Sequence, residues 1–491
     1  MPLSRREFIT TSFAIAMAGL TRDISSNAGT LVPNLATNGS DTKYRLLVDR
    51  RDIEVNGRSA NAYSLAQADG TRGVFLNPGE SFSVALINGL NEPTIVHWHG
   101  QTPPSNQDGV DQFGIAALGS GEQRIYNFPA RPGTHWMHSH VGFQAQDLLA
   151  APLIVRTNDE VRSDTQEVTV FLEDFLFRDP NAVMASLQEL NQSGQSDNAS
   201  QSAMPGMSEM KPMDMSSQSP NGRMDFNDVN FDAYLANNRT LSDPDIIRVE
   251  HGGRVRLRVI NGAASTNFHV DLGSLRGTVV AVDGDAVKPL LGSRFGLAMA
   301  QRIDIIVELP KGSGVWPIVA VREGERDQTG VILASTGAKV NKLPNKASRS
   351  AGPVAFQQEM QLSALTPLAD RPVDASHTLM LKGSMHPYSW SINGKQWPER
   401  DTVKVRAGQR VAITFHNMTM MSHPMHLHGH HFQVIAFNGK AFPGAMRDTI
   451  LVPPMTKVTI AFDADNPGQW LLHCHNDYHM AAGMMTDVAY I

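Results

Sequence analysis

Alternating apolar and polar residues form short runs along most of the chain, and turns rich in Gly and Pro separate them. Three of these runs follow a glycine and end in an asparagine: Gly79 to Asn88, Gly252 to Asn261 and Gly408 to Asn417. A period of two is the pattern of a half-buried β-strand, and helical periodicity is scarce. The pattern therefore predicts an all-β fold.

A second signature also occurs three times and begins at a glycine each time: Gly133 to His140, Gly314 to Val321 and Gly468 to His475. Two signatures that recur in the same order indicate internal repeats of one β-domain. Short strands with dense Gly and Pro between them favour β-sandwiches or barrels. We place the three domains at residues 41–160, 161–350 and 351–491.

Histidines occupy matching positions in the first and third repeats. They lie nine and eleven residues after the repeat asparagine, and five and seven residues after the repeat glycine. The middle repeat has apolar residues at these positions: Val270, Leu272, Val319 and Val321. Two residues at i and i+2 share one face of a strand. We therefore expect eight histidines to meet between the first and third domains: His97, His99, His138, His140, His426, His428, His473 and His475.

The single cysteine, Cys474, lies between two of these histidines. On a strand its thiolate would point away from both imidazoles, so one peptide could serve two metal centres. A thiolate, two imidazoles and a weak axial thioether form the blue-copper ligand set. Cys474, His423 or another distant histidine, His479 and Met484 could supply that set. Imidazole alone suits zinc as well as copper, but this Cys and Met favour copper.

Four segments closely resemble the copper motifs of multicopper oxidases: His97 to Gly100, Trp136 to His140, His423 to Gly429 and His473 to Met484. The resemblance covers residues 41–491 and implies three consecutive cupredoxin-like Greek-key β-sandwich domains. It also implies four coppers per chain. The type 1 copper would take His423, Cys474, His479 and axial Met484; the type 2 copper His97 and His426; and the type 3 pair His99, His138 and His475 on one ion and His140, His428 and His473 on the other.

The resemblance further implies one-electron oxidations at the type 1 site and the four-electron reduction of O2 to water. Asp108 and Asp477 match acidic positions that carry protons in relatives. Their alternative role is a solvated turn acid or a hydrogen-bond acceptor for a ligating histidine. Some bacterial relatives have Glu just after the last type 1 histidine, where this chain has Met480.

A polar, Met-rich stretch at about residues 192–224 points to the electron donor, since thioethers are soft ligands suited to Cu(I). Its methionines could bind Cu(I), as proposed for similar inserts in periplasmic copper-resistance oxidases: Met204, Met207, Met210, Met213 and Met215. We expect a cuprous oxidase that serves copper tolerance. A tolerated low-complexity insert in a laccase-like phenol or Mn(II) oxidase is the alternative, and a copper-sequestering protein is another.

The net charge and the N-terminal sequence indicate which partners and which cellular location to expect. A net charge of −6 over 491 residues, without a basic stripe, excludes nucleic acid as the expected partner. Arg5 and Arg6 precede an apolar run to Leu20 that is too short to span a bilayer, which resembles a twin-arginine export signal within residues 1–40. We expect a periplasmic monomer with no membrane span in the mature chain.

Overall fold

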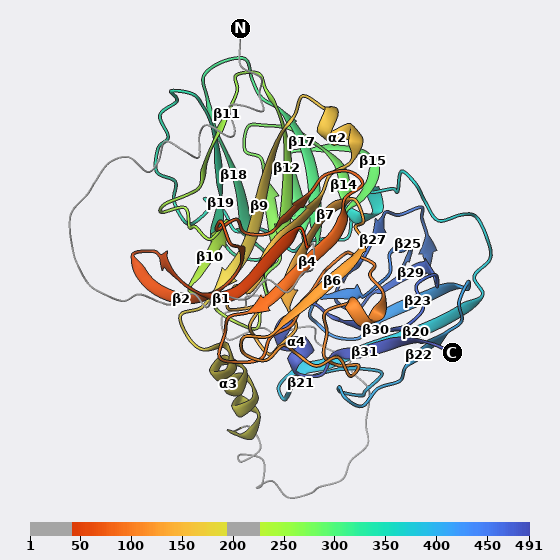
Figure 1. Ribbon diagram of the computed structural model, residues 1–491. Coiled ribbons are helices and arrows are strands. Elements are labelled where there is room, and N and C mark those ends of the chain that lie inside the picture. The colour runs from red at the N-terminus through yellow and green to blue at the C-terminus, as the bar shows by residue number, and fades with distance from the viewer. Residues whose placement is uncertain (1–41, 194–225) are drawn as a thin grey trace, which may run out of the picture. The chain divides into compact units, whose positions relative to one another are not determined.

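The computed structural model describes residues 42–193 and 226–491 (Figure 1). The predicted export signal within residues 1–40 and the Met-rich stretch from Met204 to Met215 lie outside these residues. The described chain is built mainly of β-strands in six sheets. None of its helices combines the length and the apolar character that a bilayer crossing requires.

The first two sheets lie within residues 44–155, in the orders β2-β1-β4-β6 and β3-β8-β7-β5. Their strands are β1 (Tyr44–Val55), β2 (Arg58–Gln67), β3 (Val74–Leu76), β4 (Ser81–Asn88), β5 (Val96–His97), β6 (Gln123–Pro129), β7 (Gly133–Ser139) and β8 (Ala150–Val155). A short 3-10 helix at Ser105–Gln107 precedes Asp108.

The next two sheets lie within residues 166–335, in the orders β10-β9-β12-β17-β14-β15 and β11-β19-β18-β13-β16. Helix α2 (Asn158–Arg162) leads into them, and α3 (Pro180–Ser193) follows β9. Their strands are β9 (Gln166–Phe175), β10 (Ala233–Ala236), β11 (Ile246–Val249), β12 (Arg254–Asn261), β13 (Phe268–Asp271), β14 (Gly277–Val282), β15 (Asp285–Gly292), β16 (Arg294–Leu297), β17 (Arg302–Glu308), β18 (Val315–Arg322) and β19 (Gln328–Ser335).

The last two sheets lie within residues 375–490, in the orders β21-β20-β23-β29-β25-β26, with β27 beside β25, and β22-β31-β30-β24-β28. A 3-10 helix at Glu359–Gln361 precedes them, and α4 (Asp477–Ala481) follows β30. Their strands are β20 (Ala375–Met385), β21 (Tyr388–Ile392), β22 (Val403–Val405), β23 (Arg410–Asn417), β24 (His423–Leu427), β25 (Phe432–Phe437), β26 (Lys440–Ala441), β27 (Met446–Arg447), β28 (Thr449–Val452), β29 (Lys457–Asp463), β30 (Gln469–Cys474) and β31 (Met485–Tyr490).

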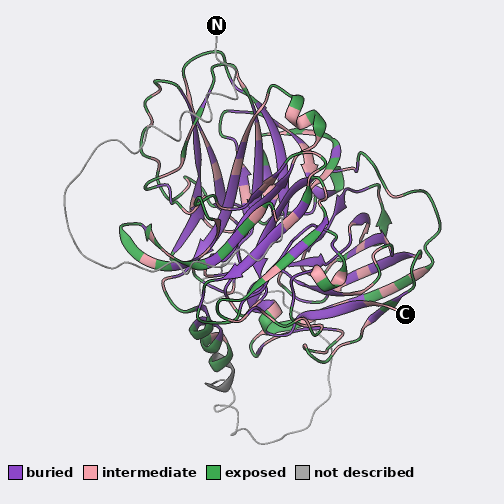
Figure 2. Cartoon of the chain, viewed as in Figure 1, coloured by how far each residue is buried: buried purple, intermediate pink, exposed green. Residues whose placement is uncertain are grey.

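The same parallel strand pairs recur in each pair of sheets. One set is β1 with β4, β9 with β12 and β20 with β23; the other is β3 with β8, β11 with β19 and β22 with β31. A parallel pair needs a crossover connection, so its recurrence reflects repeated topology. Each pair of sheets encloses an apolar core, and buried residues line the strands (Figure 2). The all-β expectation is confirmed, whereas the domain boundaries remain a prediction.

The repeat asparagines explain why the first signature recurs. Asn88, Asn261 and Asn417 are fully buried at the ends of β4, β12 and β23. Each side-chain amide donates to a backbone carbonyl of the following loop and to another carbonyl 30 or more residues away. Each side-chain oxygen accepts the N–H two residues later. Buried amides need such partners, so the asparagine fixes the loop that leads to the next strand.

The middle repeat also differs from the others in strand register. His97 pairs with His138 and His426 with His473, whereas Val270 pairs with Ala320 and Asp271 with Val319. The middle strands are therefore offset by one residue relative to the positions that the sequence aligns. Val270 and Leu272 are buried in the apolar core instead.

Candidate metal centres

Eight imidazoles converge from four places in the chain. They come from the ends of β5 and β7 in the first repeat and of β24 and β30 in the third, together with the residues just after these strands. All eight are at least 94% buried: His97, His99, His138, His140, His426, His428, His473 and His475. The structure thus brings together every histidine pair that the repeats predict.

Three groups of ring nitrogens lie within 4.8 Å of one another in this cluster. The His97 group contains His97, His99 and His426; the His138 group contains His99, His138 and His475; and the His140 group contains His140, His428 and His473. The last two are the triples that the resemblance assigns to the type 3 pair. His99 lies in two groups, which the sequence did not predict.

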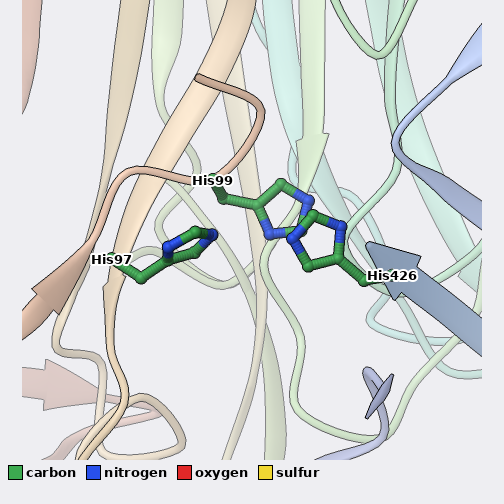
Figure 3. Close-up of side chains that lie close together, drawn as sticks. All are labelled: His97, His99 and His426. Carbon is green, nitrogen blue, oxygen red and sulfur yellow. The ribbon is translucent and has the colours of Figure 1, made fainter. Parts of the chain in front are cut away.

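The His97 group fits a metal ion well. Its three imidazoles point toward one another (Figure 3). Within the described chain, His97 Nε2, His99 Nδ1 and His426 Nε2 are buried without a hydrogen-bond partner. Their other nitrogens are held: His97 Nδ1 contacts the Asp108 carbonyl at 2.9 Å, and His426 Nδ1 contacts the Asp448 carbonyl at 2.9 Å. Outer hydrogen bonds of this kind orient metal-binding imidazoles.

Burial and neighbouring positive charges keep most imidazoles of the cluster neutral, which is the form that binds a metal ion. Burial, and then the neighbouring imidazoles and Arg side chains, lower the pKa well below its usual value for His99, His138, His140, His426, His428 and His475. Burial lowers the pKa of His473 to about 4. These rings are therefore neutral at pH 7, and a neutral imidazole nitrogen is a metal ligand.

The Cys474 group, formed by His423, Cys474 and His479, lies on the other face of the same peptide. Cys474 Sγ lies 3.7 Å from His423 Nδ1 and 3.6 Å from His479 Nδ1. Burial raises the pKa of the thiol, so a thiolate at this place calls for a bound cation. Met484 is fully buried, and its carbonyl accepts the Cys474 N–H at 3.0 Å. Its role as an axial ligand remains a prediction.

Local structure places both histidines of the Cys474 group. The Asn476 side chain caps α4 by accepting the N–H groups of Tyr478 and His479, which fixes the start of the helix. His423 Nε2 contacts Thr419 Oγ1 at 2.8 Å, and His479 Nε2 contacts Asp228 Oδ2 at 2.8 Å. Both rings therefore present Nδ1 to the sulfur.

The two predicted proton carriers occupy different surroundings. Asp108 Oδ2 lies 2.8 Å from His428 Nδ1, and Asp108 Oδ1 lies 3.3 Å from His97 Nδ1. Gly109 has φ +82°, and a Cβ there would lie 1.8 Å from the Val96 carbonyl, so only glycine lets this turn approach β5. Asp477 is buried at the start of α4, where burial and then the Asp174 charge raise its pKa to about 8.

Several residues that support the cluster were missed by the sequence analysis. Asp448 Oδ1 lies 3.1 Å from His99 Nε2, and the Arg302 guanidinium binds the same carboxylate. Burial alone would raise the pKa of Asp448, but the Arg302 charge outweighs it and holds the pKa well below its usual range. Asp228 and Thr419 were also missed. The partners are far apart in sequence, and an isolated Asp or Arg gives no motif.

The comparisons with known proteins agree with this geometry. Three family models described as multicopper oxidase match residues 72–160, 183–337 and 370–490. "Multicopper oxidase MmcO" of Mycobacterium tuberculosis is 35% identical over 84% of this chain and 80% of its own length. The chain belongs to the multicopper oxidase family. It is therefore an oxidoreductase of a copper-dependent family whose members use O2 and a reducing substrate.

Other relatives and structures extend the likeness across nearly the whole oxidase. "Copper resistance protein A" of Escherichia coli is 25% identical over 99% of this chain and 98% of its own length. The structure of Fet3p, described as a multicopper oxidase that functions in iron import, superposes with a TM-score of 0.73 at 18% identity, covering 91% of this chain and 90% of that one. At this identity the superposition shows the shared cupredoxin-type fold alone.

Proposed function

We propose that this multicopper oxidase oxidises Cu(I) and reduces O2 to water in copper tolerance. One type 1 copper would be held by His423, Cys474, His479 and Met484. The type 2 copper would lie in the His97 group, with His97 and His426, and the type 3 pair in the His138 and His140 groups. When bound, these coppers supply the one-electron acceptor and the site of O2 reduction. The three imidazole groups and the Cys474 group are four closely spaced donor sets, which supports a count of four coppers.

The observation that carries the choice of Cu(I) is a thioether-lined cavity next to the Cys474 group. The cavity has a volume of about 330 Å³, and its lining includes Ser422 and Asn476, which directly precede His423 and α4. Four methionines also line it: Met299, Met360, Met420 and Met421. Thioethers are soft ligands that prefer Cu(I) over hard cations such as Mn(II).

Exposure argues that two of these four methionines serve more than packing. The side chains of Met360 and Met420 are 44% and 63% exposed. A methionine side chain that stays exposed contributes little to folding stability through burial. A flexible thioether at the rim of a cavity can instead bind a soft metal ion. Glu323 also lines the cavity and is buried, where it accepts hydrogen bonds from the Val354 N–H and from Asn267 Nδ2. Its carboxylate adds negative character near the thioethers.

One peptide, residues 473–475, connects the proposed electron-accepting site at Cys474 with the proposed O2-reducing site at the imidazole cluster. Cys474 faces His423 and His479, while His473 and His475 on either side of it face the His140 and His138 groups. Electrons accepted at the sulfur side thus have a covalent route of one residue to the imidazole cluster. Asp108 Oδ2 lies 2.8 Å from His428 Nδ1, and this contact supports a role in supplying protons there.

The proposed function is tested by O2 consumption of the copper-loaded protein with Cu(I), Mn(II) or a phenol as the only electron donor. We expect Cu(I) to give the highest kcat/KM of the three donors. Faster turnover of a phenol or Mn(II), with slow Cu(I), would favour the laccase-like alternative, which the similarity to laccases such as "Laccase-2" of Botryotinia fuckeliana, 23% identical, keeps open. Copper binding without turnover would indicate a copper-sequestering protein.

Replacing the two exposed cavity methionines, Met360→Leu with Met420→Leu, should raise KM for Cu(I) about ten-fold and leave phenol turnover unchanged, because leucine keeps the volume but removes the thioether. Met455→Leu is the matched control, since Met455 is 64% exposed and does not line the cavity. An equal change in KM for both donors would contradict a thioether site for Cu(I).

Replacing Asp108 by asparagine should slow O2 reduction about ten- to hundred-fold, because the variant loses the carboxylate beside His428. Reduction of the type 1 site by the donor under anaerobic conditions should keep its rate. Asp111→Asn is the control, since Asp111 is exposed nearby. If both half-reactions slow equally in stopped-flow measurements, Asp108 acts on the fold and not on proton supply.

The roles of the Met-rich stretch and of Asp477 remain proposals of the same kind. Met204, Met207, Met210, Met213 and Met215 would gather Cu(I) for the cavity, and Asp477 would assist proton delivery. Export to the periplasm through the twin-arginine route is proposed from Arg5 and Arg6 and suits a protein that handles extracytoplasmic copper. We also propose that the oxidase acts as a monomer.

A further inference from the structure

The middle repeat contributes no imidazole to the cluster, yet one of its side chains reaches the cluster's edge. Arg302 begins β17 and is fully buried. Its Nε donates to the Thr134 carbonyl of β7 at 3.0 Å, and its Nη1 donates to Asp448 Oδ1 at 2.7 Å. Nη2 binds the other Asp448 oxygen. This bidentate pair joins all three repeats at one carboxylate.

Asp448 in turn holds two imidazoles of the His97 group. Its Oδ1 faces His99 Nε2 at 3.1 Å, and its backbone carbonyl faces His426 Nδ1 at 2.9 Å. The two rings stack with centroids 3.8 Å apart. Because Nε2 of His99 is engaged by the carboxylate, His99 turns its Nδ1 into the group, whereas His97 and His426 present Nε2.

Gly100 shows how closely the ion pair is fitted against this group. It directly follows His99 and has φ +87°. A Cβ on Gly100 would lie 2.6 Å from Arg302 Nη2 and 2.9 Å from Asp448 Oδ2. Glycine at position 100 therefore leaves room for the Arg302 guanidinium and the Asp448 carboxylate beside His99.

We propose that Arg302 and Asp448 are positioning residues that orient His99 and His426 for metal binding, so that the ligand-free middle repeat determines copper occupancy of the His97 group. Arg302 fixes the carboxylate through two parallel hydrogen bonds, and the carboxylate selects which nitrogen of His99 faces the metal. The inference rests on the proposed copper ligation by His99 and His426. Copper content of the wild-type protein tests that ligation separately.

The chain offers a matched control in Arg258 of β12. Arg258 is also fully buried in the middle repeat, and it also reaches the first repeat, donating to Thr134 Oγ1 at 2.9 Å. Its carboxylate partners, Asp304, Glu167 and Glu160, contact none of the eight cluster imidazoles among the described hydrogen bonds and ion pairs. Arg302→Met and Arg258→Met thus remove similar buried charges at different distances from the imidazoles.

The experiment measures copper per chain, the electron paramagnetic resonance signal of the type 2 copper, the visible absorption of the type 1 copper and the melting temperature. Arg302→Met should lower copper affinity about ten- to hundred-fold at the proposed type 2 site, which His426 serves, and at the proposed type 3 ion that His99 serves. The type 2 signal should be lost after dialysis and copper per chain should fall, while type 1 absorption remains. Arg302→Lys, a single point charge, should restore only part of the signal. Arg258→Met should keep the signal.

Two results would overturn the proposal. Full type 2 occupancy and unchanged copper per chain in Arg302→Met would show that Asp448 orients His426 and His99 without the arginine. Equal loss of type 2 copper in Arg302→Met and Arg258→Met, at equal loss of melting temperature, would show that both arginines act only on stability. If Arg302→Met does not fold, Asp448→Asn supplies the same readout, with selective loss of the type 2 signal expected and an unchanged signal contradicting the proposal.

Discussion

Replacing Cys474 by serine is expected to abolish the intense visible absorption of the proposed type 1 copper and to lower oxidase activity on the order of a thousand-fold or more. Serine is close to cysteine in size, so the fully buried site keeps its packing, but a hydroxyl does not replace a soft thiolate as a copper ligand. Absorption spectra and O2 consumption measure both effects, and circular dichroism checks the fold.

The same variant separates the two metal regions, because Cys474 lies outside the three imidazole groups. Copper bound by those groups should remain, giving about three coppers per chain instead of four in the proposed assignment. Persisting visible absorption in the serine variant would refute the role of Cys474 as the ligand. Loss of all copper would show that the sites do not load independently.

Replacing His140 by alanine is expected to produce the opposite pattern. The His140 group would keep two imidazoles, and O2 reduction should fall on the order of a hundred-fold or more, because the type 3 pair is incomplete. The type 1 absorption should persist, bleach when Cu(I) is added anaerobically, and fail to return when O2 is admitted. Rapid-mixing absorption spectroscopy follows both steps.

His251→Ala provides the control for this experiment, since His251 is exposed and lies in the middle repeat. It should match the wild type in copper content and reoxidation. Normal reoxidation of the His140→Ala variant would contradict its place in the O2-reducing site. Failure of both variants would indicate that histidine removal acts through copper loading in general.

Local sequence patterns predicted the parts of this oxidase that repeat. The strands that end at Asn88, Asn261 and Asn417 formed where their alternation indicated, but six of the eight residues in each are buried, which is more than a half-buried strand requires. The histidine pairs met because two residues apart on a strand share a face, as at His473 and His475. A single pair of histidines two residues apart is a weak indication of a metal site, but four such pairs at matching positions made the prediction specific.

Partners that occur only once could not be predicted in this way. The contact between His99 and Asp448 spans 349 positions, and its geometry depends on Arg302 in a third segment. His479 meets Asp228 in a similar way, across two repeats. The cavity near His423 is also assembled from distant loops, including Met299 and Met360. Such contacts depend on tertiary packing and produce no periodic pattern in the sequence.

The buried repeat asparagines have a consequence for how this architecture tolerates change. Asn261 secures its loop with the same amide contacts as Asn88 and Asn417, although the middle repeat contributes none of the eight cluster imidazoles. The scaffold of a repeat thus closes through its own backbone carbonyls and needs no ion to do so. Loop closure and metal binding are therefore separate properties of this domain, and a middle repeat engineered to carry histidines would keep its loop but would also need its strand register shifted by one residue.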